Sequence, residues 1–372
     1  MRTTVSTKSL CVLICCSVAF LLTGCKKKYD VARETMAFEK VIYQKTPPKE
    51  CVLDSGKSKI VAPSAAANEF VIVDSLMFVA TNRDNGMVEV LSLDDFSSKG
   101  SFINKGKASG ELTWNIDLTL NTTFTKKDGS LFATVYDIVG KIYSANISDW
   151  LNGGKADMVE ICSGVEIPRP AFWVKQLADS TVIARVLADG QTAQKRILIK
   201  DGKISSIKNM GFADGFIVPP ETDYNLLSTI IGVSPDGTKC VEAMLGFNYI
   251  NVYSPFSGEG FTICCGNRLD KLSDALATPR PERKYMFADV RTYDFGFAVL
   301  KFDTDDITYQ KGGDFSPSIL LFKWDGEALA ELKPNINFSC FDIDVRTGKL
   351  YLLDDDSKLR QFDLPATLCC SE

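Results

Sequence analysis

An internal repeat constrains this chain of 372 residues more than any other feature of its sequence. Six times, a polar turn leads directly into a short apolar strand, and successive turns lie roughly 55 residues apart. The residues that mark the six turns are Ser75, Gly129, Ser180, Gly237, Gly296 and Gly348. Such even spacing is typical of a repeat architecture in which each copy is one supersecondary unit. A chain made of two unrelated domains would not produce it.

Each of the first five copies holds four strand-like segments that are rich in β-branched and aromatic residues and separated by Gly, Asp, Asn or Ser. In the first copy these segments are 69–73, 73–80, 87–93 and 100–105. Only residues 270–277 have a helical pattern, which excludes a TIM barrel. Two separate β-sandwiches would leave the six equal repeats unexplained. The sequence therefore predicts an all-β, six-bladed β-propeller of four-stranded antiparallel blades.

The sixth copy is one strand short. After its strand-like segment 358–364, only residues 365–372 remain. A candidate strand at 57–62, upstream of the first copy, has no other place in the repeat. If it forms the outer strand of the last blade, it closes the ring and covers an exposed strand edge. The alternative assigns 57–62 to an N-terminal tether; we favour closure and predict a propeller over residues 51–372.

The first 25 residues resemble the signal peptide of a bacterial lipoprotein. Arg2 and Lys8 form a basic start, and the apolar stretch Leu10–Leu22 is too short to span a bilayer. The stretch ends in Leu22-Thr23-Gly24-Cys25, which is similar to the lipobox of that family. The resemblance implies a signal peptide over 1–24, removed by cleavage, and an acylated Cys25 that holds the protein in the lipid bilayer. The alternative is an uncleaved apolar N-terminus with a chance cysteine.

Residues 25–50 follow as a charged segment, which we interpret as a lipidated tether. Lys26, Lys27 and Lys28 either contact anionic headgroups or are solvated. Lys26 is not the aspartate that retains some lipoproteins in the inner membrane. We therefore expect an outer-membrane lipoprotein that faces either the periplasm or the cell surface.

Composition and motifs narrow the function. The chain has no histidine, which excludes Ser-His-Asp and Cys-His catalysis and every histidine metal site. Its 42 Lys and Arg against 47 Asp and Glu argue against nucleic acid as a partner. No P-loop, nucleophile elbow or dinucleotide fingerprint is present in the sequence. We favour a binding module for a protein, peptide or glycan and expect no cofactor. The alternative is a propeller hydrolase or lactonase with a metal in the central channel.

The cysteines do not form a recognisable framework. Four of the 12 belong to the leader and the lipobox, the others include two adjacent pairs, and there is no CxxC motif. We interpret most of them as small buried hydrophobic residues rather than as disulfides. The pair Cys369-Cys370 is the exception expected to react. The disulfide state of Cys264, Cys265, Cys369 and Cys370 stays open.

Three short segments resemble a known family. Ser234–Thr238, with the sequence SPDGT, is similar to the turn of TolB-type propeller blades, and residues 68–80 and 106–112 add to this likeness. With the lipobox, they resemble the TolB-like six-bladed β-propeller lipoproteins of diderm bacteria. Members often carry a Gly-x-Gly-Pro-Gly-Glu turn, from which this chain departs at Ala108 and Ser109. The resemblance implies a fold and an address outside the cytoplasm, but no reaction.

Antiparallel geometry divides the loops between two faces. The turn between the second and third strands of a blade lies on the same face as the connection into the next blade, which we name the long-loop face. The other two turns lie on the short-turn face. Long connections at 209–223, 266–285 and 301–317 predict function on the long-loop face. The expected binding residues are Trp114, Arg169, Trp173, Arg280, Arg283, Asp305, Asp306 and Tyr309. We expect docking near the fifth blade and the channel mouth, unless these loops merely drifted in length.

Overall fold

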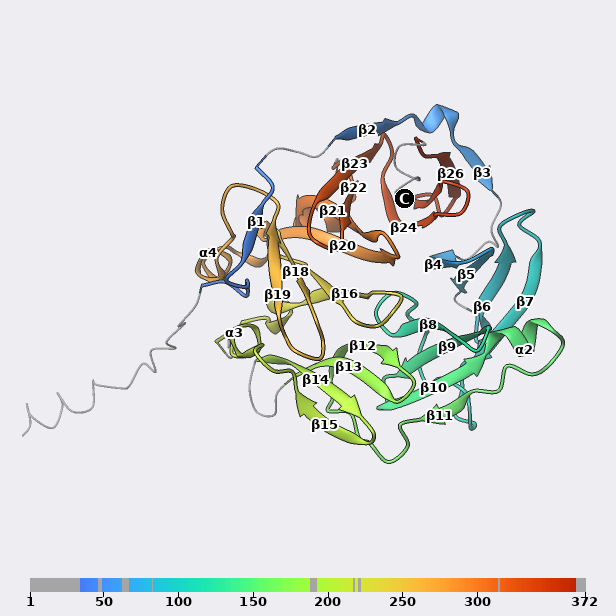
Figure 1. Cartoon of the computed structure of the whole chain (residues 1–372). Helices are drawn as coiled ribbons and strands as arrows, with labels where there is room; N and C mark the ends of the chain where they lie inside the picture. The colour runs from blue at the N-terminus through green and yellow to red at the C-terminus, as the bar shows by residue number, and fades with distance from the viewer. Residues whose placement is uncertain are drawn as a thin grey trace, which may run out of the picture. The chain divides into compact units, whose positions relative to one another are not determined.

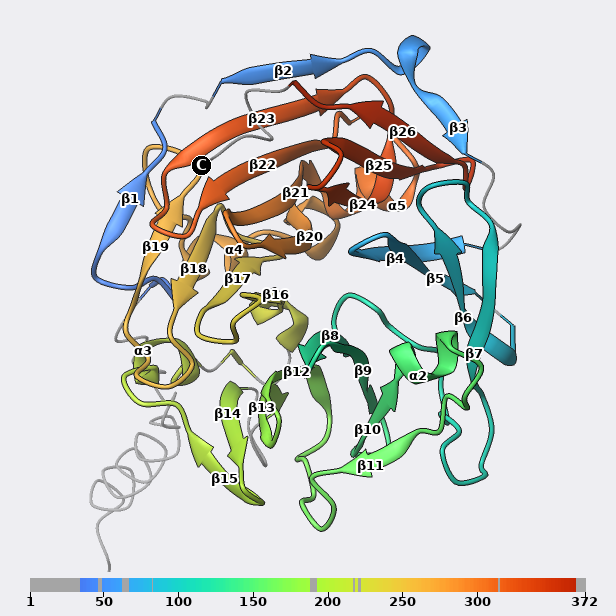
Figure 2. The same cartoon turned by 45° about the vertical axis from the view of Figure 1, so that its right-hand side comes forward.

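The computed structural model describes residues 34–45, 49–61, 67–81, 83–187, 193–216, 218–219, 222–313 and 315–365. In this part the chain forms six sheets, each with four antiparallel strands, that follow one another around a common centre (Figure 1). A second view shows the strands of each sheet stacked outward from that centre (Figure 2). The predicted six-bladed β-propeller is confirmed.

The blades follow the sequence repeat, and the first strand of each blade is the innermost one. Blade one contains β4 (Ala67–Val73), β5 (Leu76–Thr81), β6 (Asn85–Ser92) and β7 (Ser98–Asn104). Blade two contains β8 (Thr122–Lys127), β9 (Ser130–Asp137), β10 (Lys141–Asn146) and β11 (Val159–Ile161). Blade three contains β12 (Ala171–Ala178), β13 (Thr181–Leu187), β14 (Gln194–Lys200) and β15 (Lys203–Ser206).

The second half of the ring has the same plan. Blade four contains β16 (Thr229–Val233), β17 (Cys240–Met244), β18 (Tyr249–Tyr253) and β19 (Gly260–Cys264). Blade five contains β20 (Lys284–Tyr293), β21 (Gly296–Asp305), β22 (Ser318–Lys323) and β23 (Ala328–Pro334). Blade six contains β24 (Phe338–Asp344), β25 (Lys349–Asp354) and β26 (Leu359–Asp363) from its own repeat.

The missing outer strand of blade six is β3 (Lys59–Val61), as the sequence predicts. It pairs antiparallel with β26, and Ile60 lies opposite Arg360. The chain thus starts and ends its ring in the same sheet, so the ladder of β26 has a partner instead of an open edge. Closure by an N-terminal strand is confirmed.

Two further N-terminal strands cover blade edges. β1 (Val41–Tyr43) pairs parallel with β19 of blade four, and β2 (Glu50–Leu53) pairs parallel with β23 of blade five. The approach to β1 is also packed, because Met36 and Phe38 are buried and the Phe38 backbone N–H donates to Thr262 Oγ1 at 2.8 Å. The described part of segment 25–50 therefore packs on the propeller from about Glu34 onward. Without β1 and β2, the outer edges of β19 and β23 would have no partner strand. The interpretation of residues 25–50 as a tether did not include this pairing.

Short helices occupy several connections between strands. They are α2 (Ile147–Leu151), α3 (Gly211–Asp214), α4 (Leu272–Ala277) and α5 (Asp306–Gln310), with 3-10 turns η1 (Ser55–Lys57), η2 (Tyr224–Leu227) and η3 (Arg280–Glu282). The helical pattern at 270–277 is thus confirmed as α4. Among the described residues, no helix has the length and apolar character needed to cross a membrane.

The turn residues show why the repeat is visible in the sequence. Asp128-Gly129 and Asp201-Gly202 all have φ values between 49° and 78°, as two-residue hairpins require. The Asp-Gly pair of the SPDGT segment does not form such a hairpin, because only Gly237 there has a positive φ. Pro235 fixes a negative φ, and the Asp236 carboxylate accepts hydrogen bonds from Ser234 Oγ and the Thr238 backbone N–H at 2.5 and 3.0 Å. The segment forms a longer turn between β16 and β17 instead.

Six cysteines lie in the described part, and none of them is in a disulfide: Cys51, Cys162, Cys240, Cys264, Cys265 and Cys340. Burial raises the pKa of the Cys265 and Cys340 thiols to about 12, so they stay protonated and act as small apolar groups. Cys369 and Cys370 lie outside the described residues, as do the signal peptide and Cys25.

Blades three and four share a sealed charge cluster, which we name the inter-blade cluster: Arg185, Arg196, Asp214, Glu242 and Tyr253. Arg185 and Arg196 lie directly opposite each other on β13 and β14, which would be repulsive alone. Glu242 of β17 lies between the two blades and accepts from Arg196 Nε and Nη2 at 2.7 and 2.5 Å. Arg196 Nη1 also donates to Asp214 at 2.7 Å. Two positive charges thus meet two carboxylates.

Candidate functional site

Two cavities lie at the propeller axis, one on each face. The long-loop cavity, of about 430 Å³, is formed largely by residues near the beginnings of the inner strands. Its lining residues are Asn68, Glu69, Asp117, Thr119, Leu120, Phe172, Ser228, Thr229, Ile230, Leu245, Tyr285, Ala288, Asp289, Ser339 and Cys340. The short-turn cavity, of about 480 Å³, is formed by strand ends and their turns, including Lys126, Lys175, Arg291, Arg346, Asp342 and Asp344.

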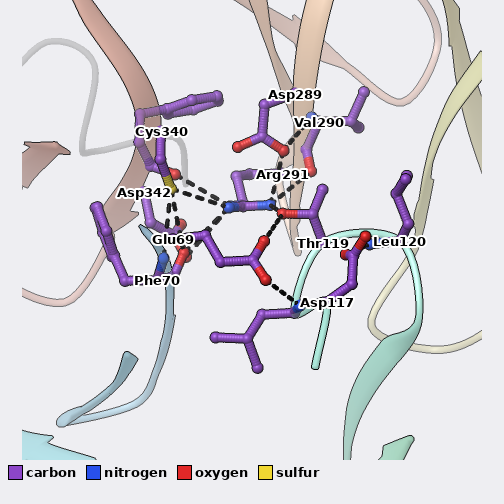
Figure 3. Close-up of polar contacts among 12 residues, drawn as sticks. Glu69, Phe70, Asp117, Thr119, Leu120, Asp289, Val290, Arg291, Cys340 and Asp342 are labelled. Carbon is purple, nitrogen blue, oxygen red and sulfur yellow. Dashed lines mark hydrogen bonds and ion pairs between the residues drawn. The ribbon is translucent and has the colours of Figure 1, made fainter. Parts of the chain in front are cut away.

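A cluster of ionisable residues from four blades and one connection separates the two cavities, and we name it the axial cluster: Glu69, Asp117, Lys175, Asp289, Arg291 and Asp342. Arg291 of β20 is its centre (Figure 3). Its Nη1 donates to Asp289 Oδ1 at 2.8 Å, and its Nε lies 3.7 Å from Asp342 Oδ2. The same Nε donates to the Phe341 backbone oxygen at 3.0 Å, and Nη2 donates to the Phe70 backbone oxygen at 3.1 Å. Arg291 thereby ties the inner strands of blades five, six and one together.

Both carboxylate oxygens of Asp342 in β24 accept hydrogen bonds. Its Oδ1 accepts from Tyr293 OH at 2.9 Å and from the Ile343 backbone N–H at 2.8 Å, while Oδ2 accepts from the Ile72 backbone N–H at 2.7 Å. Asp342 lines the short-turn cavity, whereas Asp289 lines the long-loop cavity. The two carboxylates beside Arg291 therefore face opposite cavities.

Glu69 of β4 extends toward the connection that leads into blade two (Figure 3). Its Oε1 accepts from the Leu118 backbone N–H at 2.6 Å, and its Oε2 accepts from Thr119 Oγ1 at 3.1 Å. Asp117 holds the same connection in shape, because its Oδ1 accepts from the Leu120 backbone N–H at 2.5 Å. Burial and the negative charge of Asp117 together raise the pKa of Glu69 to about 7.

Burial also shifts the pKa values of Asp289 and Lys175 toward the neutral form. Burial raises the pKa of Asp289 to about 7, although Arg291 opposes this shift. Lys175 of β12 has one hydrogen bond, from Nζ to the Thr122 backbone oxygen at 2.5 Å, and burial lowers its pKa to about 8. The axial cluster combines four carboxyl groups with two basic groups, Arg291 and Lys175. Several displaced pKa values beside a cavity are typical of a functional site.

The residues predicted for blade five come together at the rim of the long-loop face. Asp305 caps α5 by accepting from the Thr308 backbone N–H at 2.7 Å, and the Asp306 backbone N–H donates to the Arg283 backbone oxygen at 3.0 Å. Arg280 is 65% exposed and lies 3.4 Å from Asp223. Tyr309 packs edge-on against Tyr285, with ring centroids 4.6 Å apart, and Tyr285 lines the long-loop cavity. A residue of the rim therefore contacts a residue of the cavity wall.

The other three predicted residues lie elsewhere. Trp114 is 60% exposed in the connection between blades one and two, and Lys105 Nζ lies 5.6 Å from its ring centroid. Arg169 is partly exposed, 3.9 Å from Glu166. Trp173 is fully buried and donates from Nε1 to Thr229 Oγ1 at 3.2 Å, because β12 directs it between blades three and four. Trp173 thus packs the fold and presents no surface to a partner.

Sequence reasoning missed the axial cluster. Glu69 and Asp289 each look like an isolated acid within a strand pattern, and Asp342 stands beside a second acid, Asp344, in an otherwise apolar strand. A signal was present in hindsight, since ionisable residues at the inner strand of several copies are unusual in an apolar pattern. Among the described residues, no group of three or more His, Cys, Asp or Glu side chains is arranged to hold a metal ion.

No family model matches the chain, and no curated protein matches it. Among solved structures, a member of the DUF4221 family from Bacteroides vulgatus is similar, with a TM-score of 0.51 and 11% identity over 83% of this chain and 98% of that chain. A protein from Bacteroides fragilis whose export is inferred has a TM-score of 0.51 and 11% identity over 87% of this chain and 98% of its own. At this identity the likeness is one of fold.

Proposed function

We propose that the protein is a membrane-anchored lipoprotein outside the cytoplasm whose propeller binds a protein, peptide or glycan on the long-loop face. The observation that carries the proposal is the contact between Tyr309 of the exposed blade-five rim and Tyr285 in the wall of the long-loop cavity. A concave apolar surface with a few convergent polar groups is the usual form of a binding site.

The rim has the composition of a protein-binding surface. Tyr and Arg are enriched in the residues that dominate binding energy, and Tyr309 and Arg280 supply both types in exposed positions. Tyr309 is held by the rings of Phe302 and Phe315, with centroids 5.3 and 6.2 Å away. A side chain that is already ordered loses little entropy when a partner binds.

The anchor is proposed from the lipobox-like segment that ends in Cys25. The likeness in fold to a Bacteroides fragilis protein whose export is inferred supports an extracytoplasmic address. The SPDGT segment and the six blades support placement among TolB-like lipoproteins, in the outer membrane. The alternative function, a hydrolase or lactonase with a metal in the central channel, stays a prediction from the sequence.

Partner capture followed by substitution tests the binding face. The lipidated protein is crosslinked in its native membrane, and the recovered partner is then measured with purified variants. We expect Arg280→Ala and Tyr309→Ala to weaken binding by about tenfold each. Asp128→Asn and Asp201→Asn serve as controls on the short-turn face, because Asn tolerates the φ values of 50° and 49° at these positions. Weakening by the control pair alone would place the partner on the opposite face.

Substitution of Cys25 tests the anchor. Cys25→Ser removes the thiol that would carry the lipid, so we expect an unprocessed precursor without an acyl label. Metabolic labelling with a radioactive fatty acid and the mobility of the protein on a gel measure both effects. Normal processing and labelling of the variant would disprove the lipid site.

A further inference from the structure

The long-loop cavity presents negative groups without a facing cation. Glu69, Asp117 and Asp289 line it, and no Lys or Arg is among the described lining residues. Its volume of about 430 Å³ lies within the usual range for small organic ligands, about 300 to 1,000 Å³. We propose that this cavity binds an alkylammonium group, that is, a protonated amine on a short apolar chain. This inference goes beyond the proposed function, because it does not depend on which partner covers the rim.

Asp289 supplies the most direct support. Its side chain is only 4% exposed, and its Oδ1 accepts hydrogen bonds from the Val290 backbone N–H and from Arg291 Nη1, both at 2.8 Å. Its Oδ2 makes none of the hydrogen bonds or ion pairs found in the described part of the chain, and Figure 3 shows that oxygen without a contact. Because Asp289 lines the cavity, this oxygen is open to it and can accept a hydrogen bond from a bound molecule. An ammonium group in the cavity would donate that hydrogen bond.

The charge balance at the axis points the same way. The four carboxyl groups of the axial cluster face only two basic groups. Arg291 reaches Glu69 only through the Thr119 hydroxyl, to which it donates at 3.3 Å. Lys175 donates to a backbone oxygen rather than to a carboxylate. Above about pH 7, where Glu69 and Asp289 are ionised, one additional positive charge in the long-loop cavity would therefore be favourable, because no Lys or Arg is among the described residues that line it.

The walls select an organic cation. Phe172, Tyr285, Leu120 and Ile230 provide apolar and aromatic surface beside the carboxylates. Such walls bury a short alkyl chain, and an aromatic face attracts an ammonium group. The three carboxylates do not form a set that could hold a bare metal ion. Together these features fit an amine that carries an apolar chain.

Calorimetric titration of the full-length protein in lipid nanodiscs at pH 8 tests the inference. The probe is n-pentylammonium, with pentan-1-ol and pentanoate as neutral and anionic matches. We expect saturable 1:1 binding of the ammonium and at least about tenfold weaker binding of the other two compounds. Equal binding of all three, or no binding of the ammonium, would overturn the proposal.

Three variants locate the probe. Asp289→Asn and Asp117→Asn should each weaken n-pentylammonium binding by about tenfold, because each removes one charge from the cavity. Asp342→Asn is the matched control, since it removes the other carboxylate beside Arg291 but lines the opposite cavity. It should change affinity by less than about twofold. If Asp289→Asn does not fold, the more exposed Asp117→Asn decides the test. Equal weakening by Asp342→Asn would reject this cavity as the site.

A second ligand identifies the source of the amine. Binding of acetyl-Gly-Lys-Gly-amide as tightly as n-pentylammonium would indicate a lysine side chain of a peptide. Binding of n-pentylammonium alone would indicate a free small amine. Both outcomes support an ammonium site, and failure of both ligands rejects it. The rim variants at Arg280 and Tyr309 test the proposed partner separately, so either idea can fail without the other.

Discussion

Two clusters in this propeller bury an arginine between carboxylates, and they differ in what surrounds them. The inter-blade cluster is sealed between blades three and four, and two arginines meet two carboxylates there. In the axial cluster, which lies between two cavities, four carboxyl groups meet two basic groups. Arg196 and Arg291 are both buried, so burial alone does not distinguish the clusters. The two clusters differ instead in their balance of charges and in their access to a cavity.

The pKa values of Glu242, Glu69 and Asp289 follow this difference, although burial raises the pKa of Asp214 in the inter-blade cluster. Burial of Glu242 opposes its ionisation, but Arg196, Arg185 and Tyr253 together outweigh burial, and the pKa of Glu242 stays below its ordinary value. At the axis, burial prevails, and the pKa values of Glu69 and Asp289 rise to about 7. A balanced, sealed cluster stabilises a fold, whereas an unbalanced cluster beside a cavity keeps groups near neutrality that can respond to a ligand.

The largest effect is expected in the sealed cluster. Arg196→Met leaves Glu242 buried with one distant arginine, Arg185, 3.8 Å away. We expect the free energy of unfolding to fall by about 3 to 5 kcal/mol, as when one partner of a buried pair is removed. Urea denaturation followed by circular dichroism measures it. A loss below about 1 kcal/mol would show that the cluster is not structural.

The pH dependence of stability should reveal the axial cluster. A carboxyl whose pKa is higher in the folded than in the unfolded state binds more protons when folded, so its contribution to stability falls as pH rises. For Glu69, with a folded pKa of about 7 against 4.5, this loss spans roughly pH 5 to 8. Between pH 5 and pH 8, we expect the unfolding free energy of Glu69→Gln to decrease by about 1 to 2 kcal/mol less than that of the wild type.

The control for this experiment is the other cluster. Arg196→Lys keeps the charge beside Glu242 and leaves Glu69 untouched, so it should lower stability without flattening the pH profile between pH 5 and 8. The measurement is thermal or urea unfolding at a series of pH values. An unchanged slope in Glu69→Gln would contradict a raised pKa at the axis.

The smallest effect is expected for an exposed pair at the edge of the axial region. Lys126 donates to Asp74 at 2.7 Å on the short-turn face, and both side chains are more than half exposed. Lys126→Ala should change the free energy of unfolding by less than about 0.5 kcal/mol, because solvent screens exposed pairs. Urea denaturation measures this change. A larger loss of unfolding free energy would show that an exposed ion pair can also stabilise the fold.

Much of the fold could be predicted because its signals are local. Asp-Gly turns with positive φ, period-two strands and a repeat of roughly 55 residues all lie within one blade. The closure by β3 also followed, since an incomplete last copy and an unused strand upstream imply each other. The edge strands β1 and β2 did not, because three or four residues carry too weak a pattern to show that they have a partner.

The sequence by itself thus determined the number of blades, the order of their strands and the chemical types available on the long-loop face. Only the tertiary structure decided which residues meet at the axis, since Glu69, Lys175 and Arg291 lie in three different blades and no spacing relates them. It also decided that Trp173 is buried while Tyr309 remains at the rim. The physical reason is that hydrogen bonding and turn geometry act between near neighbours in the chain. Burial and charge balance depend instead on every blade that surrounds a residue.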